Sequence, residues 1–134
     1  MHRITLYAIA LGLLPATIQA QALREIGKTS VGTPVMLETR SVKRAGEIVT
    51  ATVRVKLVPP LKGAQGELRS SRTIAMYDCA KRSVATKESW YYLDEAGRKE
   101  GMHKVIKTPG FGAVFKGSLA DVAMLHLCAP KSPA

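Results

Sequence analysis

The chain has 134 residues, and its 20 Lys and Arg against 10 Asp and Glu give a formal net charge of +10 at pH 7. This length is enough for one small domain and leaves no room for a second of ordinary size. A charge of this sign attracts polyanions, which include acidic proteins, sulfated sugars, lipid headgroups and nucleic acid.

The first 22 residues are typical of a signal peptide. Arg3 supplies a positive start, and an uncharged apolar run follows from residue 4 to 14. Ala20 and Ala22 fit the small-x-small cleavage rule, so we expect a cut after Ala22, with Ala20 as the near alternative. A membrane-spanning helix needs roughly 20 apolar residues, so no transmembrane anchor is expected. We therefore predict an exported protein, located in the periplasm, secreted or on the cell surface.

Cys79 and Cys128 are the only two cysteines, and both follow the predicted cleavage site. In an exported protein two cysteines usually pair, so we expect a disulfide between them. They have no Cys-x-x-Cys spacing, which disfavours a metal site and a catalytic thiol. No cysteine lies beside the cleavage site, so lipidation is not expected there. The sequence predicts no metal and no cofactor.

Short strands are predicted along the first half of the domain. Residues 49–57 form the clearest one, because Val, Ala and Leu alternate there with Thr50, Thr52, Arg54 and Lys56. Strict alternation is typical of a half-buried strand. We expect Pro59 and Pro60 to end it. The other expected segments are strands at 23–31 and 35–38, a polar and basic stretch at 41–46, and a mobile loop at 61–68.

The second half continues as strands and then changes period. Residues 71–79 carry apolar side chains on both faces, so we expect a central strand. Strands at 83–93 and 99–106 flank a turn at 94–97. Ser118 and Asp121 stand in capping-box register at the start of a predicted helix, which Pro130 would end. The apolar stripe expected on this helix consists of Val122, Leu125 and Cys128, flanked by Met124.

These elements predict an α+β fold: an antiparallel sheet of about six strands, with a C-terminal helix tethered to one face by the disulfide. The expected organisation is a signal peptide at 1–22, one domain at 23–129 and a short tail at 130–134.

Groups that could carry catalysis are sparse, and we expect no enzyme. No Gly-x-Ser-x-Gly elbow occurs, and the acids are scattered singly apart from Asp94 and Glu95 in a turn. We interpret His103, on an exposed strand, and His126 as solvated or hydrogen-bonded side chains rather than catalytic ones. The aromatic set Trp90, Tyr91 and Tyr92 is a further feature that could carry binding, with Trp90 and Tyr92 on one strand face and Tyr91 on the other. We expect Trp90 to pack in the core, and an exposed adhesive face is the alternative.

Binding through a basic surface is the favoured function. The partner would be an acidic protein or a sulfated glycan, and export argues against nucleic acid as the physiological ligand. A homodimer through an edge strand is a further hypothesis. The candidate binding residues are Arg54, Lys56, Arg69, Arg72, Lys81 and Arg82.

The order of several motifs resembles the surface-adhesin protein E family of proteobacteria. The stretch from Ser41 to Val49, SVKRAGEIV, precedes the alternating strand. SRTIAMYDC at 71–79 leads into WYYLDEAG at 90–97, and a Pro-Gly pair, a short helix and Cys128 follow. The resemblance runs from about residue 23 to residue 128.

The resemblance implies a six-stranded antiparallel sheet whose C-terminal helix is tied to one face by a disulfide. It also implies adhesion, since named members lie on the bacterial surface and bind host matrix and serum proteins. By this analogy a basic strip would comprise Arg69, Arg72, Lys81 and Arg82. The alternative hypotheses are a periplasmic structural or assembly protein of the envelope, and a small hydrolase or enzyme inhibitor.

Overall fold

The structure is a computed structural model that describes residue 12 and residues 22–129. The predicted signal peptide, apart from residues 12 and 22, and the predicted tail at 130–134 lie outside the described residues. Within the described part, the elements in chain order are β1 (Leu23–Lys28), β2 (Pro34–Glu38), a 3-10 turn η1 (Thr39–Ser41), β3 (Lys43–Ala45), β4 (Ile48–Gly63), β5 (Gly66–Asp78), β6 (Ser83–Tyr92), β7 (Glu100–Val105), β8 (Gly112–Ala113) and α1 (Leu119–Leu127).

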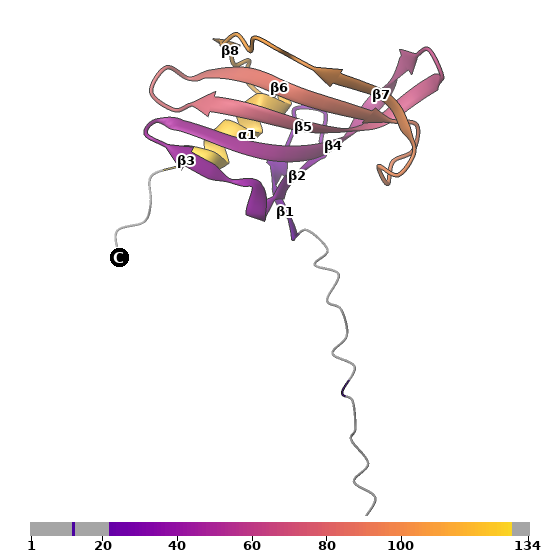
Figure 1. The fold of residues 1–134 in the computed structure, drawn as a ribbon, viewed down its shortest axis with the longest axis horizontal. Coiled ribbons are helices and arrows are strands. Elements are labelled where there is room, and N and C mark those ends of the chain that lie inside the picture. Colours follow the sequence, from indigo (N-terminus) through magenta and orange to yellow (C-terminus); the bar gives the residue numbers. More distant parts are fainter. Residues whose placement is uncertain (1–11, 13–21, 130–134) are drawn as a thin grey trace, which may run out of the picture.

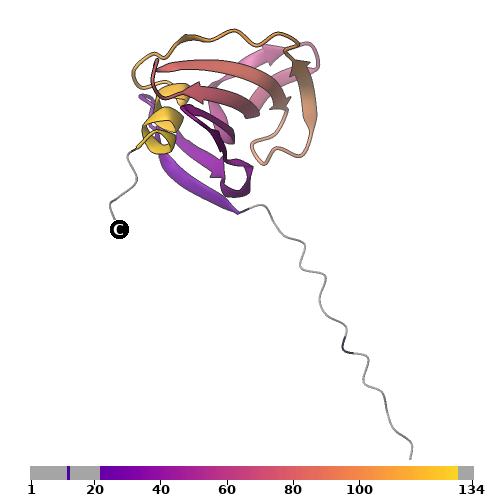
Figure 2. The same ribbon diagram turned by 60° about the vertical axis from the view of Figure 1, so that its left-hand side comes forward.

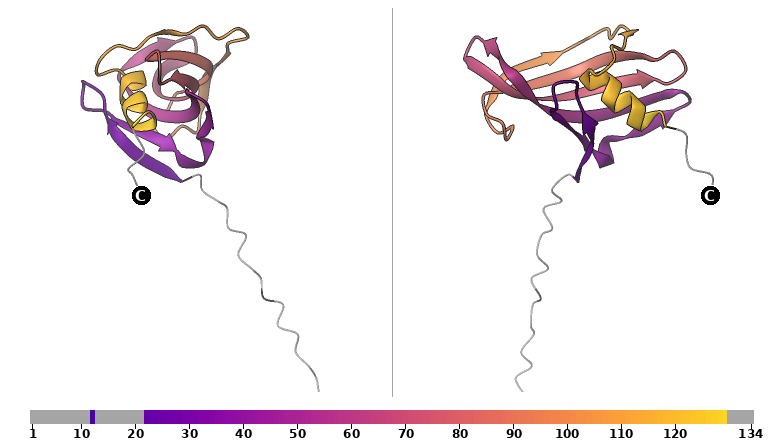
Figure 3. Two further views of the ribbon diagram at one scale, coloured as in Figure 1. Left: turned by 90° about the vertical axis from the view of Figure 1, so that its left-hand side faces the viewer. Right: turned by 180° about the vertical axis from the view of Figure 1, so that it is seen from behind.

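One antiparallel sheet organises the molecule, in the strand order β1-β2-β4-β5-β6-β7. Short β3 pairs with β4, and short β8 pairs with β6. The strands are strongly twisted and curl around the helix, which the turned view shows clearly (Figures 1 and 2). Seen from behind, α1 lies across the strands of one face (Figure 3, right). The predicted six-stranded sheet with one covering helix is confirmed, and β5 is central as expected.

We call the side covered by α1 the helix face, and the other side the opposite face. The alternation in β4 places Val49, Ala51, Val53 and Val55 on the helix face, where all four are buried. Each of the three valines removes apolar surface from water and contributes about 1.5–3 kcal/mol when fully buried. The polar residues between them lie on the opposite face, so the predicted half-buried strand is confirmed.

The expected end of this strand is wrong. β4 continues through Pro59 and Pro60 to Gly63, and Gly66 begins β5 after a tight turn. The register with β5 shifts between Lys56 and Leu61. Proline lacks a backbone donor, but it can lie where the ladder is interrupted. Residues 61–68, expected to form a loop, therefore form the tip of a β-hairpin.

The helix has its predicted cap but not its predicted buried stripe. Ser118 Oγ accepts a hydrogen bond from the Asp121 backbone N–H at 3.2 Å. Leu125 is 59% exposed, while the buried apolar side chains are Val122, Ala123, Met124 and Leu127. At about 100° per residue, Ala123, Met124 and Leu127 form the centre of the buried arc, Val122 lies at its margin and Leu125 lies on the far side.

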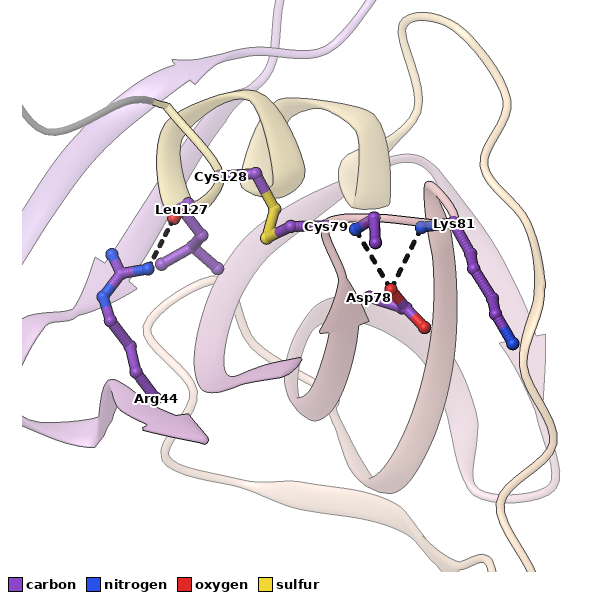
Figure 4. The surroundings of a disulfide bond; sticks show 7 residues. Arg44, Asp78, Cys79, Lys81, Leu127 and Cys128 are labelled. Atoms are coloured by element: carbon purple, nitrogen blue, oxygen red, sulfur yellow. Dashed lines mark hydrogen bonds between the residues drawn. A yellow bond between two sulfur atoms is a disulfide. The ribbon is translucent and has the colours of Figure 1, made fainter. Parts of the chain in front are cut away.

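The disulfide joins the end of β5 to the end of α1, as predicted. Cys79 follows the last residue of the strand, Cys128 is the C-cap of the helix, and their Cα atoms lie 5.5 Å apart. Nearby, Arg44 Nη1 donates to the Leu127 carbonyl at 2.8 Å (Figure 4). The last carbonyls of a helix lack partners within it, so this contact and the disulfide both hold the same end of α1.

Candidate binding site

A row of directly opposed residues crosses the opposite face. The strand registers pair Arg54 with Arg72, Arg72 with Trp90, and Trp90 with His103. Residues opposite each other in antiparallel strands project to the same side and contact one another. The sheet therefore aligns two cations, an indole and an imidazole that are far apart in the sequence.

Glu38 holds the two arginines of this row. Its side chain is 2% exposed. Arg54 Nε donates to Glu38 Oε2 at 3.0 Å, Arg72 Nε donates to the same oxygen at 2.6 Å, and Arg72 Nη2 donates to Oε1 at 3.0 Å. A buried carboxylate needs such partners, because removing it from water is costly. Glu38 thus organises the row from the end of β2.

The pKa of Glu38 reflects two opposing effects, its burial and its contacts with the two arginines. Burial acts first and raises the pKa, but the hydrogen bonds from Arg72 and Arg54 and their positive charges outweigh it. The net pKa lies below the ordinary value, so Glu38 is charged at neutral pH. In turn, the hydrogen bond with Glu38 raises the pKa of Arg72. The negative charge of Glu88 also acts on Arg72, so Arg72 interacts with two acids and Arg54 with Glu38.

Trp90 lies in this row and not in the core, so its expected place is wrong. The Arg72 guanidinium carbon lies 4.7 Å from the centre of the Trp90 ring. His103 stacks on Trp90, with ring centres 5.0 Å apart and 8° between planes. A cation over the face of an indole is attracted by the negative potential of the ring, so Trp90 links the arginines to β7.

His103 also contacts a carboxylate, the pairing that would favour the hydrolase hypothesis if it occurred in a cleft. His103 Nε2 lies 2.6 Å from Glu88 Oε1, and its side chain is 40% exposed on the edge strand β7. Ser89, the serine next to Glu88, points to the helix face and is buried. The pair therefore lies on an exposed strand, and the neighbouring serine faces away from it, so this geometry is not that of a nucleophile activated by a base.

A pocket lies next to the row on the opposite face. Its volume is about 340 Å³ and its lining is mostly apolar. Arg54 and Lys56 of β4 contribute its cationic groups. The other lining residues are Leu23 of β1, Pro34 and Met36 of β2, Val55 of β4, Ser70 and Ser71 of β5, Tyr92 of β6, and Glu95, Ala96 and Gly97 of the turn after β6.

The turn after β6 forms one wall of this pocket, and hydrogen bonds to Ser70 of β5 and within the turn hold it in place. Ser70 Oγ donates to the Asp94 carbonyl oxygen at 2.6 Å. The Asp94 carboxylate accepts the backbone N–H groups of Arg98 and Lys99 at 3.0 Å each. These bonds, that from Lys99 first, lower the pKa of Asp94. The charged carboxylate thereby closes the turn, and the wall is preformed.

The six predicted binding residues do not lie together. Arg54 and Arg72 are in the row, and Lys56 is at the pocket, where its Nζ lies 3.4 Å from Glu95. Arg69 is three positions from Arg72 on β5, so it points to the other face, and it pairs with Glu67 at 2.8 Å. The turn with Lys81 and Arg82 is at the far end of β5, where Arg82 approaches Asp121 at 3.6 Å. The strand geometry therefore places Arg69, Arg72, Lys81 and Arg82 on separate parts of the surface.

A second exposed feature is the projecting hairpin, residues 57–69, which we call the β4–β5 arm. The neighbouring strands β2 and β6 pair with β4 and β5 only as far as Val55 and Ser70. Beyond that point the arm extends past the rest of the sheet (Figure 1). Val58 is 60% exposed and Leu61 is 48% exposed there. The arm also carries the exposed cations Lys62 and Arg69.

Sequence reasoning placed Trp90 and Tyr92 on one strand face but missed Glu38 and the contacts of Trp90 with Arg72 and His103. Glu38 ends a short apolar strand, VMLE. An acid directly after buried apolar residues could have indicated a buried carboxylate that needs a cationic partner. The cross-strand partners depend on register, which no local pattern shows. In the described part of the chain, no helix is long and apolar enough to cross a membrane, and no three His, Cys, Asp or Glu side chains gather as metal ligands.

Comparison with solved structures supports the same architecture. Protein E of Haemophilus influenzae, in crystal form II, is similar with a TM-score of 0.56 and 15% sequence identity, covering 81% of this chain and 91% of that one. Its selenomethionine form is similar with a TM-score of 0.54 and 14% identity, over 81% and 90% of the two chains. At such identity the likeness concerns the fold alone. A search of curated proteins found no match.

The family model described as surface-adhesin protein E matches residues 23–129, which is most of the chain. Its description is that of a surface protein that adheres, in agreement with the resemblance seen in the motifs. The chain belongs to the surface-adhesin protein E family.

Proposed function

We propose that this protein is an exported, non-enzymatic binding domain that engages an acidic partner through its basic surface. The partner is a host matrix or serum protein, or a sulfated glycan. Membership of a surface-adhesin family supports the class of function. The net charge of +10 supports the sign of the partner, because a basic surface attracts polyanions and accelerates their association.

The observation that carries this proposal is the β4–β5 arm. It combines exposed apolar side chains, Val58 and Leu61, with the cations Lys62 and Arg69 on one projecting hairpin. Protein interfaces commonly have an apolar centre with a polar rim, and arginine is enriched in them. Arg69, which pairs with Glu67 of the same hairpin, is the predicted binding residue within this arm, while Lys56 lines the pocket. Arg54 and Arg72 serve the Glu38 row, and Lys81 and Arg82 lie at the other end of β5.

The test compares two charge reversals of equal size. Lys62→Glu with Arg69→Glu changes the arm, and Lys81→Glu with Arg82→Glu changes the distant turn. Binding to immobilised matrix proteins and to a sulfated glycan is measured at 0.15 M and at 1 M salt, where the screening length falls from about 8 Å to about 3 Å. We expect the arm variant to lose binding and the turn variant to keep it.

Two outcomes would contradict the proposal. Binding that is unchanged between the two salt concentrations would remove the electrostatic contribution. Binding lost only in the turn variant would place the partner away from the arm. Cell fractionation addresses the envelope-assembly alternative, because protein confined to the periplasm cannot contact a host ligand.

Self-association through an edge strand stays a prediction. Among the described strands, β1 and β7 each have a sheet neighbour on one side only. An unpaired edge exposes backbone donors and acceptors to another copy, while charged side chains such as Lys28 on β1 and Lys104 on β7 oppose such pairing. Either edge is a candidate for the homodimer that we propose. A monomer in light scattering at high concentration would contradict it.

A further inference from the structure

The pocket beside the row has the size of a small-molecule site. Its volume of about 340 Å³ lies in the range of ligand pockets, roughly 300–1,000 Å³. A space of this size is many times that needed by one water molecule, so it admits a small organic molecule. The apolar side chains of Met36 and Tyr92 line it from two sides. An occupant of this size would be mostly apolar.

Arg54 supplies a polar anchor at one side of this apolar space. Its Nε is occupied by Glu38, and among the described residues neither Nη atom has a hydrogen-bond partner. A β-carbon placed on Gly97 would lie 3.9 Å from Arg54 Nη1, so this nitrogen is at the wall formed by the turn. The guanidinium group can donate two parallel hydrogen bonds to a carboxylate.

The cationic groups around the pocket differ in how far acids already occupy them. Arg54 and Arg72 share the carboxylate of Glu38, and Arg72 also interacts with the negative charge of Glu88. The other lining cation, Lys56, already has Glu95 as its counterion. The Nη groups of Arg54 are therefore the cationic donors that remain for an anionic ligand group in the pocket, and a neutral ligand would use them less well.

We propose that this pocket binds a small amphipathic carboxylate of the medium-chain fatty-acid class. The carboxylate accepts hydrogen bonds from the two Nη groups of Arg54, and the alkyl chain lies along Met36 and Tyr92. The wall at 94–97 is already held by Ser70 and Asp94, so little ordering is needed on binding. This site is separate from the β4–β5 arm and does not depend on the function proposed above.

The test uses decanoate, which has twelve non-hydrogen atoms, below its micelle concentration, with decanol as the uncharged probe. Isothermal titration calorimetry of the purified protein measures affinity and stoichiometry. We expect one decanoate per chain, and an affinity at least about tenfold above that of decanol, because a hydrogen bond to a charged group contributes about one to two powers of ten. The backbone NMR signal of Gly97 should shift, and that of distant Gly46 should not.

Three variants distinguish loss of the Arg54 anchor from a general effect on the protein structure. Arg54→Gln should weaken decanoate binding about tenfold or more and leave decanol binding unchanged. Ala96→Phe adds a ring at a lining position and should weaken both probes. Arg69→Gln is the matched control, because it removes the same charge from the other face of β5 and should change neither affinity. Circular dichroism confirms that each variant is folded.

The proposal fails if decanol binds as tightly as decanoate, if Arg54→Gln binds decanoate like the parent protein, or if no saturable binding occurs. It also fails if a short peptide with an apolar, free C-terminus binds at Gly97 more tightly than decanoate does. That result would assign the pocket to a chain terminus of a partner protein. Loss of arm-dependent adhesion would affect none of these measurements, so the two proposals fail independently.

Discussion

Arg54 and Arg72 lie directly opposite each other on β4 and β5, and both donate to Oε2 of Glu38. Like charges opposite each other destabilise a sheet, so two facing arginines would by themselves oppose the pairing of these strands. The buried carboxylate reverses the sign of this interaction. The central strands are thus joined on the helix face by apolar packing and on the opposite face by one acid.

Replacing this acid should be strongly destabilising. In Glu38→Gln the two arginines remain half-buried and face each other without this counterion, so we expect the free energy of unfolding to fall by about 3 kcal/mol. Urea denaturation measures it. The matched control is Glu67→Gln, which removes an exposed partner of Arg69 and should cost less than about 1 kcal/mol. Equal effects of the two substitutions would show that Glu38 has no special role.

The same residue predicts how stability depends on pH. The pKa of Glu38 in the folded protein is below its ordinary value of 4.5, so the unfolded chain binds its proton more readily. The stabilisation is therefore complete above about pH 4.5 and is lost as the pH falls through the folded-state pKa. Unfolding measured from pH 7 to pH 3 should show the stability difference between the parent protein and Glu38→Gln shrinking below pH 4.5. A difference that stays constant would contradict this assignment.

The disulfide should account for a large part of the stability. It closes a separation of 49 residues, and in the chain-entropy model its removal costs about 4 kcal/mol. The double substitution Cys79→Ser with Cys128→Ser avoids a free thiol. We expect a lower midpoint in urea and loss of amide-exchange protection in α1 before the sheet, because the bond holds the end of the helix. Unchanged protection of α1 would mean that packing alone keeps the helix in place.

Gly27 allows the close approach of β1 to α1. Its φ is +152°, and a β-carbon there would lie 2.7 Å from Cγ1 of Val122. Gly27→Ala should therefore strain the backbone and push the helix outward, at a cost of about 1–3 kcal/mol. Gly110→Ala is the control, since no atom lies within 4 Å of its added carbon. Thermal unfolding that is the same in both variants would contradict the close packing at Gly27.

Local sequence patterns predicted those elements that depend on a single local interaction. The alternation from Val49 to Leu57 predicted a strand with one buried face, because period-2 patterning matches the pleat. Ser118 with Asp121 predicted the start of the helix, because the side-chain cap is a local interaction. The prediction that Pro59 and Pro60 end the strand was wrong. Proline ends a strand only where the neighbouring strand requires a backbone N–H donor at that position. Leu125 was placed wrongly because the helix buries the arc of Ala123, Met124 and Leu127, and the local pattern alone does not show which apolar arc meets the sheet.

The amino-acid sequence by itself determined the strand-rich α+β class, the pairing of the only two cysteines, the capped C-terminal helix and the basic character of the surface. All four follow from composition, local periodicity and cysteine chemistry. The tertiary structure alone decided that Glu38, Arg54, Arg72, Trp90 and His103 form one row, and that a pocket lies beside it. These contacts depend on strand order and register, which arise from packing between distant segments, so no local pattern in the chain could show them.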